Sequence, residues 1–316
     1  MLSKLSAFRP SECLALTIGT FDGVHLGHRA VIRKLLETAK AKKIKSAVLT
    51  FPIPPMNFLS SGRKKKLIIP FEKRAELLEK AGIDYVITVD FAEIMGLSAG
   101  EFIERLLAER LKAKAVVVSG KFMFGKKREG DMHLLKRLSK KYGFEAYSVR
   151  IKKLSGKTIS STAIRQALED GNIRAARGML GYNPVLEGSV VHGLKIGRQL
   201  GFPTANLHID STMQIPKEGI YACFVLIEEK RFRGALYIGK RPTFGGKKTT
   251  VEATIIDEGF SEELYGKKME VQIIERIRDD MRFKNEGDLI DQIRKDVEKA
   301  RRILNSSKVR WQEWAG

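Results

Sequence analysis

Cysteine is almost absent from this sequence. Its 316 residues include only Cys13 and Cys223, which stand far apart along the chain. They are too few and too far apart in the sequence to suggest a disulfide framework or a thiolate metal site. Unpaired cysteines are typical of a reducing compartment, so we expect a cytoplasmic protein.

Long apolar runs are missing as well. No stretch approaches the roughly eighteen uncharged apolar residues that a membrane-spanning helix needs. The N-terminal segment MLSKLSAFRPSECLALTIG has no uninterrupted apolar core that ends in a small-residue cleavage site. The sequence therefore predicts neither a membrane span nor a secretory signal, and we expect no membrane partner.

Acidic residues are few relative to basic ones. The chain carries 58 Lys and Arg against 37 Asp and Glu, a formal net charge of +21. Such an excess favours anionic partners, which include nucleotides, nucleic acid and membrane surfaces. An RNA-binding or regulatory role is one interpretation. The sequence contains no RRM, KH or zinc-knuckle pattern, however, so nucleic acid is not the partner we expect.

Short apolar, β-branched runs alternate with helical patterns through the first half of the chain. Strands are expected at 14–18, 46–51, 85–89, 115–119 and 145–151, and helices at 30–41, 71–81, 99–111 and 132–142. This rhythm predicts an α/β domain with a doubly wound parallel sheet. A helix pair at 161–169 and 173–180 follows, and Gly181 and Pro184 mark its end.

The rhythm changes after residue 184. Strands are expected at 187–192, 221–227, 232–238, 251–256 and 269–276, with no helix between them. Such a series predicts an antiparallel sandwich or barrel. An amphipathic helix at 286–304 closes this part. We therefore expect one domain at 1–182, a second at 183–304, and a tail at 305–316.

The first candidate site is the run Gly19-Thr20-Phe21-Asp22-Gly23-Val24-His25-Leu26-Gly27-His28, between the first expected strand and helix. A helix that begins at a strand end presents backbone N–H groups and a positive dipole end to an anion. Gly23 and Gly27 allow the backbone to approach a phosphate closely. His25 and His28 project from one face of the first turn, where imidazoles can donate to phosphates. A zinc pair and two structural histidines are the alternatives.

A second element, Ile159-Ser160-Ser161-Thr162-Ala163-Ile164-Arg165, lies far along the chain. Small hydroxyl side chains at the start of a helix are good N-caps, and that alone would explain them. Arg165, one turn later, adds a guanidinium fork for phosphate oxygens.

Together these elements resemble the nucleotidylyltransferase superfamily, and the string GTFDGVHLGH resembles the FMN adenylyltransferase half of bacterial bifunctional riboflavin kinase/FAD synthetases. The resemblance implies a transfer of AMP from MgATP to FMN by direct in-line attack, with release of pyrophosphate. It implies that His25 and His28 hold ATP phosphates, and that Ser160, Ser161, Thr162 and Arg165 clamp the leaving pyrophosphate. Gly19, Phe21, Asp22, Gly23 and Gly27 would complete the ATP site.

The chain departs from that family at two places. After the second expected strand the family usually carries a histidine, whereas this chain reads Ile53-Pro54-Pro55. After the fourth strand the family typically has Asp or Asn where this chain has Lys121. A cation there either binds phosphate in a new way or weakens adenylyl transfer. A riboflavin kinase with a weak or inactive adenylyltransferase domain is therefore the alternative.

The second candidate site lies in the later half. Gly193, Gly197 and Arg198 belong to a Gly-rich stretch that can wrap phosphates through backbone N–H groups. Thr204 and Asn206, in the run Pro203-Thr204-Ala205-Asn206, offer hard oxygen ligands suited to Mg²⁺. Taken alone, that run reads as a simple turn.

The later half resembles the riboflavin kinase family. The resemblance rests on further motifs in the same order, listed here: Gly188–Gly193, Gly219–Ala222, Gly239–Phe244, Val251–Ala253, Tyr265-Gly266, and Arg278 with Phe283. It implies a six-stranded antiparallel β-barrel that binds MgATP and riboflavin, with Glu252 as the catalytic base. The alternative for Glu252 is a solvent-facing side chain on an alternating strand. Tyr237 stands where the family often has Asn. The expected products are FMN and FAD, made from riboflavin and ATP.

Overall fold

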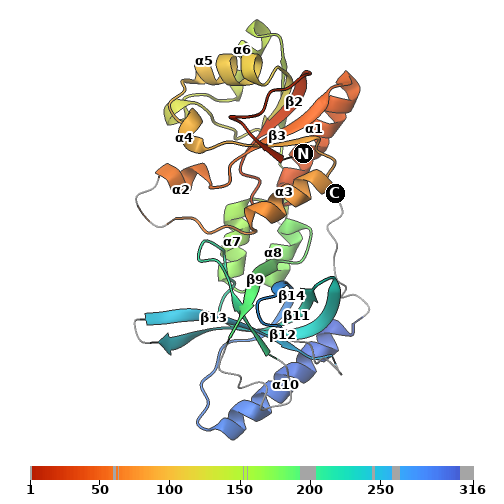
Figure 1. Ribbon diagram of the computed structural model, residues 1–316, viewed down its shortest axis with the longest axis vertical. Coiled ribbons are helices and arrows are strands. Elements are labelled where there is room, and N and C mark those ends of the chain that lie inside the picture. The colour runs from red at the N-terminus through yellow and green to blue at the C-terminus, as the bar shows by residue number, and fades with distance from the viewer. Residues whose placement is uncertain are drawn as a thin grey trace. The chain divides into compact units, whose positions relative to one another are not determined.

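The computed structural model describes residues 2–59, 62, 64–151, 153–154, 156–192, 204–243, 246–257 and 264–306 (Figure 1). Contacts divide these residues into two compact units. The first comprises the described residues up to Lys65 and Pro70–Ser161, and the second comprises Lys66–Ile69 and the described residues from Thr162 onward. Within these ranges no helix is long and apolar enough to cross a bilayer.

A parallel sheet of six strands forms the centre of the first unit. Its order is β1-β4-β3-β2-β5-β6. The strands are β1 (Leu2–Lys4), β2 (Leu14–Ile18), β3 (Lys45–Thr50), β4 (Tyr85–Thr88), β5 (Ala113–Ser119) and β6 (Glu145–Val149). The five expected strands are confirmed, and the short edge strand β1 is an addition. The strand order reverses between β2 and β5, and such a reversal opens a ligand crevice at the carboxyl ends of those strands.

The helices of this unit complete the doubly wound arrangement. They are α1 (Leu26–Lys42), α2 (Pro55–Leu59), α3 (Phe71–Lys80), α4 (Phe91–Ile94), α5 (Ala99–Glu101) and α6 (Met132–Lys141), with the 3₁₀ turn η2 (Lys126–Arg128). The expected helix 99–111 is mostly a π-helix, η1 (Phe102–Arg110). Leu14, Leu16 and Ile18 of β2 share a core with η1 and α6. The hairpin β7 (Lys153–Leu154) and β8 (Lys157–Thr158) follows β6.

The second unit contains α7 (Ser161–Glu169), whose first residue belongs to the first unit, α8 (Ile173–Leu180) and a closed six-stranded barrel. The barrel order is β10-β13-β12-β11-β14-β9. Its strands are β9 (Val185–Val191), β10 (Thr204–His208), β11 (Gly219–Ile227), β12 (Lys230–Thr243), β13 (Gly246–Ile255) and β14 (Lys268–Arg278). Every pair in it is antiparallel. The expected barrel is thereby confirmed, and the run 204–206, which alone reads as a turn, begins strand β10.

The C-terminal helix α10 (Glu286–Leu304) lies along the outside of the barrel, over β11 and β12 (Figure 1). Val297, Ala300 and Leu304 pack against Ala222 and Ala235. The expected helix at 286–304 is confirmed to the residue. Contacts group most of α7 and all of α8 with the barrel. The expected domain boundary at 182 stays a prediction.

Candidate active sites

His25 and His28 form a stacked pair at the start of α1. His25 is the N-cap residue, with φ −66° and ψ 170°, and its Nδ1 accepts the backbone N–H of His28 at 3.2 Å. The two ring centroids lie 3.6 Å apart with an interplanar angle of 13°. A Cβ at Gly27 would lie 3.0 Å from both His25 Cε1 and Ile151 Cγ2. The absence of a side chain at Gly27 therefore makes space for the His25 ring.

His28 is held in conditions that favour the neutral ring. Burial lowers the pKa of His28 well below its usual value, and the positive charges of His25 and Arg74 lower it further. The His28 Nδ1 is buried and has no hydrogen-bond partner among the described residues. Because His25 Nδ1 is an acceptor, neutral His25 carries its proton on Nε2, where the ring is a donor.

The turn between β2 and α1 needs the residues that the sequence provides. Phe21 has φ 53° and Gly23 has φ 82°, both in the left-handed region. The Phe21 ring lies beside His28, with centroids 5.1 Å apart. A Cβ at Gly19 would lie 3.2 Å from Phe21 Cε2, so glycine there makes room for the ring. Asp22 is buried, with 1% of its surface exposed.

The second sequence element meets this turn. Ser161 Oγ donates to the backbone carbonyl of Asp22 at 3.0 Å, although 139 residues separate them. Ser160 precedes it in the same unit. Thr162 and Arg165 belong to the second unit, where Arg165 Nε donates to the carbonyl of Lys66 at 2.6 Å. Their position relative to the histidines stays a prediction.

Lys121 lies beyond the carboxyl end of β5, the strand next to β2 in the sheet. It follows β5 after Gly120, in a turn closed by the Phe122 N–H on the Ser119 carbonyl at 3.0 Å, and it is exposed. Since β2 and β5 flank the reversal of strand order, the histidine turn and Lys121 lie at neighbouring strand ends. The sheet order supports the prediction that Lys121 borders the nucleotide site.

Sequence reasoning missed one residue of this region, Arg74 of α3. It is fully buried, and it donates to the backbone carbonyls of Thr20 and Phe51, at 2.7 Å each. The only signal in the sequence was a basic residue on the apolar side of an expected helix, next to Ala75 and one turn from Leu78.

In the barrel, strand register brings two predicted site residues, Asn206 and Glu252, into one row with Tyr237, where the family often has Asn. Glu252 of β13 lies opposite Asn206 of β10 on one side and opposite Tyr237 of β12 on the other. Directly opposed residues of antiparallel strands point to the same face. All three are half-buried, whereas Val251 and Ala253 beside Glu252 are buried inside the barrel. The row therefore lies on the outer face.

Oxygen-bearing side chains extend this row. Thr204 lies two residues before Asn206 on the same face of β10, and it is opposite Thr254 of β13. Hydroxyl and amide oxygens with a nearby carboxylate fit a Mg²⁺ ion that is bound mainly through ATP phosphates. Across the described ranges no group of three or more His, Cys, Asp or Glu could hold a metal ion.

Other members of the kinase motifs also come together. The ring of His192, at the end of β9, stacks on Tyr265 with centroids 4.0 Å apart and an angle of 26°. The Tyr237 hydroxyl donates to Asp280 Oδ2 at 3.4 Å, in the segment between β14 and α10. Gly193, Gly197 and Arg198 lie outside the described residues.

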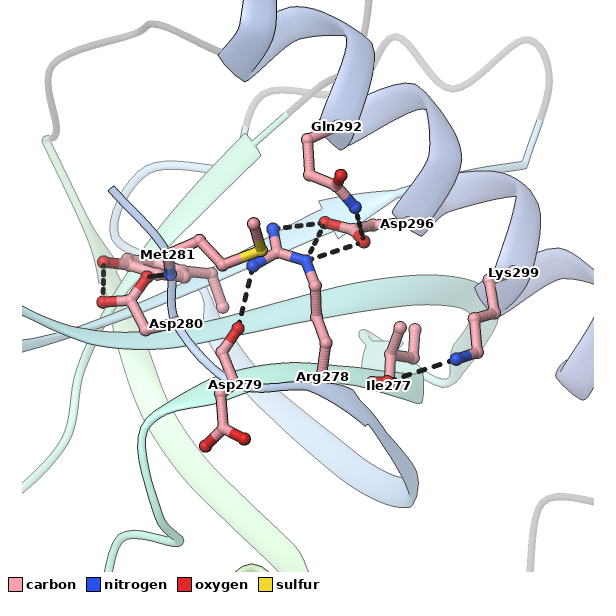
Figure 2. A network of polar contacts seen from close by, with 9 residues as sticks. Ile277, Arg278, Asp279, Asp280, Met281, Gln292, Asp296 and Lys299 are labelled. Atoms are coloured by element: carbon pink, nitrogen blue, oxygen red, sulfur yellow. Dashed lines mark hydrogen bonds and ion pairs between the residues drawn. The ribbon is translucent and has the colours of Figure 1, made fainter. Parts of the chain in front are cut away.

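A largely buried ion pair ties Arg278, the last residue of β14, to α10. Figure 2 shows the Arg278 guanidinium between Asp296 of α10 and the backbone carbonyl of Asp279. Arg278 Nη2 lies 2.6 Å from Asp296 Oδ2, and its Nε lies 2.9 Å from Asp296 Oδ1. Gln292 donates to the same carboxylate at 2.9 Å. Arg278 lies opposite Ile220, which lies opposite Tyr237, so this pair continues the row that contains Glu252.

Comparisons with known proteins agree on both halves. A sequence profile of FAD synthetase matches residues 9–163, and one of riboflavin kinase matches residues 180–304. The chain is 37% identical over 303 residues to the bifunctional riboflavin kinase/FMN adenylyltransferase of Haemophilus influenzae, which covers 95% of this chain and 97% of that protein. It is 36% identical over 301 residues to the protein of the same name from Escherichia coli, with 95% of each covered.

A solved structure resembles the whole fold. The crystal structure described as a macrolide-efflux protein from Streptococcus pneumoniae is similar with a TM-score of 0.86 and 30% identity, and 96% of this chain and 97% of that chain are covered. Its description names efflux, whereas both profiles and the curated relatives name flavin chemistry. With two profiles in sequence order and relatives matched along nearly their full length, the chain belongs to the family of bifunctional riboflavin kinase/FMN adenylyltransferases.

Proposed function

We propose that this protein phosphorylates riboflavin to FMN in the barrel and adenylylates FMN to FAD in the parallel α/β domain, with ATP as the donor in both steps. Residues 1–182 would carry adenylyl transfer and residues 183–304 the kinase reaction. The single observation that carries the proposal is the row Asn206, Glu252 and Tyr237, because register alone brings them together. Both cysteines are free, which suits a reducing compartment and supports a cytoplasmic location.

In the kinase site, Glu252 acts as the general base. Its carboxylate accepts the proton of the ribityl hydroxyl while the hydroxyl oxygen bonds to the γ-phosphorus of ATP and the bond from that phosphorus to the leaving ADP oxygen breaks. Thr204 and Asn206 would hold Mg²⁺, which neutralises charge on the transferred phosphoryl group. Gly193, Gly197 and Arg198 would wrap the phosphates.

In the adenylyl-transfer site, an oxygen of the FMN phosphate attacks the α-phosphorus of ATP, and the bond to the leaving pyrophosphate breaks. No proton needs to move, so the residues act by position and charge. His25 and His28, at the start of α1, would donate to the phosphates. Gly19, Phe21, Asp22, Gly23 and Gly27 would shape the turn beneath them. Ser160, Ser161, Thr162 and Arg165 would clamp the pyrophosphate.

The first experiment is a chromatographic assay with riboflavin, ATP and Mg²⁺, in which FMN and FAD are followed over time. We expect FMN to appear before FAD. FMN that accumulates without FAD, even when FMN itself is supplied, would reduce the function to a riboflavin kinase, the alternative that Lys121 favours. If neither product forms, the proposal is wrong.

The role of Glu252 has a specific test. Glu252→Gln keeps the shape of the side chain but cannot accept the proton, so kcat for FMN formation should fall by about 10² to 10⁴. The matched control is Glu275→Gln, an exposed glutamate on β14 of the same barrel. Adenylylation of supplied FMN should be unchanged in both variants. Kinase activity of the Glu252→Gln variant at the level of wild type would rule out the base.

A further inference from the structure

Arg74 is a buried cation in a place where arginine is rarely found. It lies in α3, on the same buried side as Leu77 and Leu78, with 0% of its surface exposed. Arginine is almost never fully buried unless it is paired. Within the described part of the chain Arg74 forms no ion pair, and its Nε is buried with no hydrogen-bond partner.

The hydrogen-bond partners of Arg74 are all backbone carbonyls. Nη1 donates to Thr20 and to Phe51 at 2.7 Å each, and Nη2 reaches the carbonyl of Pro52 at 3.4 Å. Thr20 follows β2 within two residues, and Phe51 follows β3 directly. The guanidinium therefore joins the loops that leave two neighbouring parallel strands.

One of these loops leads straight to the histidine pair. Thr20 precedes Phe21 and Asp22, and the left-handed φ of 53° at Phe21 turns the chain toward His25. A displaced Thr20 carbonyl would move the Phe21 ring that packs on His28. Arg74 thus holds the base of the turn on which both histidines are mounted.

The charge of Arg74 also needs an explanation. A neutral hydrogen-bond donor could bind the same three carbonyls with a smaller desolvation penalty, since burial of a cation costs several kcal/mol. Burial lowers the pKa of Arg74, and the charge of Asp22 opposes that shift. The Arg74 charge in turn disfavours protonation of His28. A fixed positive charge beneath a site is useful where the substrate is a polyphosphate.

Resting on the proposed adenylyl transfer, we propose that Arg74 is a positioning residue of that site. Its guanidinium ties the loop after β2 to the loop after β3, and so fixes the turn on which His25 and His28 are mounted.

The test compares Arg74→Met and Arg74→Lys with Lys80→Met, an exposed lysine at the end of the same helix. We expect kcat/KM for FAD formation from FMN to fall about a hundredfold in Arg74→Met, because small displacements of catalytic groups have effects of that order. Arg74→Lys keeps the charge but loses the fork, and should fall about tenfold. Lys80→Met should match wild type. Riboflavin phosphorylation, measured on the same samples, should be unchanged in all three.

A pH profile separates positioning from mere loss of stability. The charged groups that act on His28 are His25, the N-cap of its own helix, and Arg74 of α3. Without the Arg74 charge, His28 protonates more readily, so the acid limb of kcat/KM should move to higher pH in Arg74→Met and stay in place in Arg74→Lys. Wild-type kcat/KM in both variants, or an equal loss at every pH, would overturn the inference. Wild-type protein that makes no FAD would instead overturn the proposed adenylyl transfer.

Discussion

The histidine pair illustrates how much one residue's surroundings determine its chemistry. His28 carries a ring whose Nδ1 is buried and whose neighbours His25 and Arg74 both oppose a second proton. An imidazole in solution would be partly protonated near neutral pH. In this site the ring stays neutral, which leaves an N–H to donate to phosphate without a labile charge.

This state of His28 gives the protein a predictable pH dependence. The folded-state pKa of His28 lies below the unfolded value, so the unfolded chain binds the extra proton and the free energy of unfolding falls as pH drops below about 6.5. When the pH falls from 7.5 to 5.5, the free energy of unfolding of His28→Gln should fall by up to about 1.4 kcal/mol less than that of the wild type. Calorimetry at both pH values measures this, with His133→Gln, an exposed histidine of α6, as control. Equal losses in wild type and His28→Gln would contradict the neutral ring.

Lys121 is the second residue whose role can be tested by itself. If it contacts an anionic substrate, Lys121→Asp should raise KM for ATP or FMN in adenylyl transfer about tenfold, the worth of a charge-assisted hydrogen bond. Lys114→Asp, at the amino end of the same strand β5, places the same charge change away from the crevice and should have little effect. If KM for ATP and for FMN are both unchanged in Lys121→Asp, Lys121 does not contribute to substrate binding.

At the scale of elements, α10 is held to the barrel by more than apolar packing. Arg278 and Asp296 have side chains only 16% and 7% exposed, and Gln292 completes the acceptor set of the carboxylate. The connection that follows Arg278 carries Asp280, whose carboxylate accepts a hydrogen bond from Tyr237, one strand from Glu252. Loss of this anchor should therefore affect the kinase site as well as stability.

Removal of one partner from a buried ion pair leaves the other charge uncompensated. Asp296→Ala should lower the free energy of unfolding by about 3–5 kcal/mol and raise KM for riboflavin. Asp291→Ala breaks the Asp291–Arg294 pair on the same helix, which is exposed and spans 3.7 Å, and it should change stability by less than about 1 kcal/mol. Thermal unfolding and initial rates of FMN formation measure both effects. Similar results for the two variants would mean that the buried pair contributes little.

At the scale of the whole molecule, the net charge of +21 acts on every anionic substrate. Riboflavin is neutral, whereas ATP and FMN are anions, so only the latter are steered by the positive field. Raising the salt concentration toward about 0.5 M should raise KM for ATP in both reactions and leave KM for riboflavin nearly unchanged. Steady-state rates with each substrate varied in turn measure this. A rise in KM for riboflavin equal to that for ATP would argue against electrostatic steering.

The sequence by itself determined the strand and helix order, because apolar periodicity and β-branched runs are local properties. It predicted the α7, α8 and α10 boundaries to the residue, and it drew attention to the turn at His25 and His28 and to Glu252. It gave a weaker view of β10, since the run at 204–206 has the composition of a turn. Capping residues and periodic patterns lie within a few positions of what they specify, so they can be read directly.

Only the tertiary structure decided which distant residues meet. The row of Asn206, Glu252 and Tyr237 depends on strand register, and a shift by one residue would turn each side chain to the opposite face. Burial of Arg74 depends on loops after two strands that precede it by more than twenty residues. No local pattern encodes such contacts, because they arise when the sheet closes and the helices pack on it, and hydrogen bonds between segments far apart then become the most stable choice.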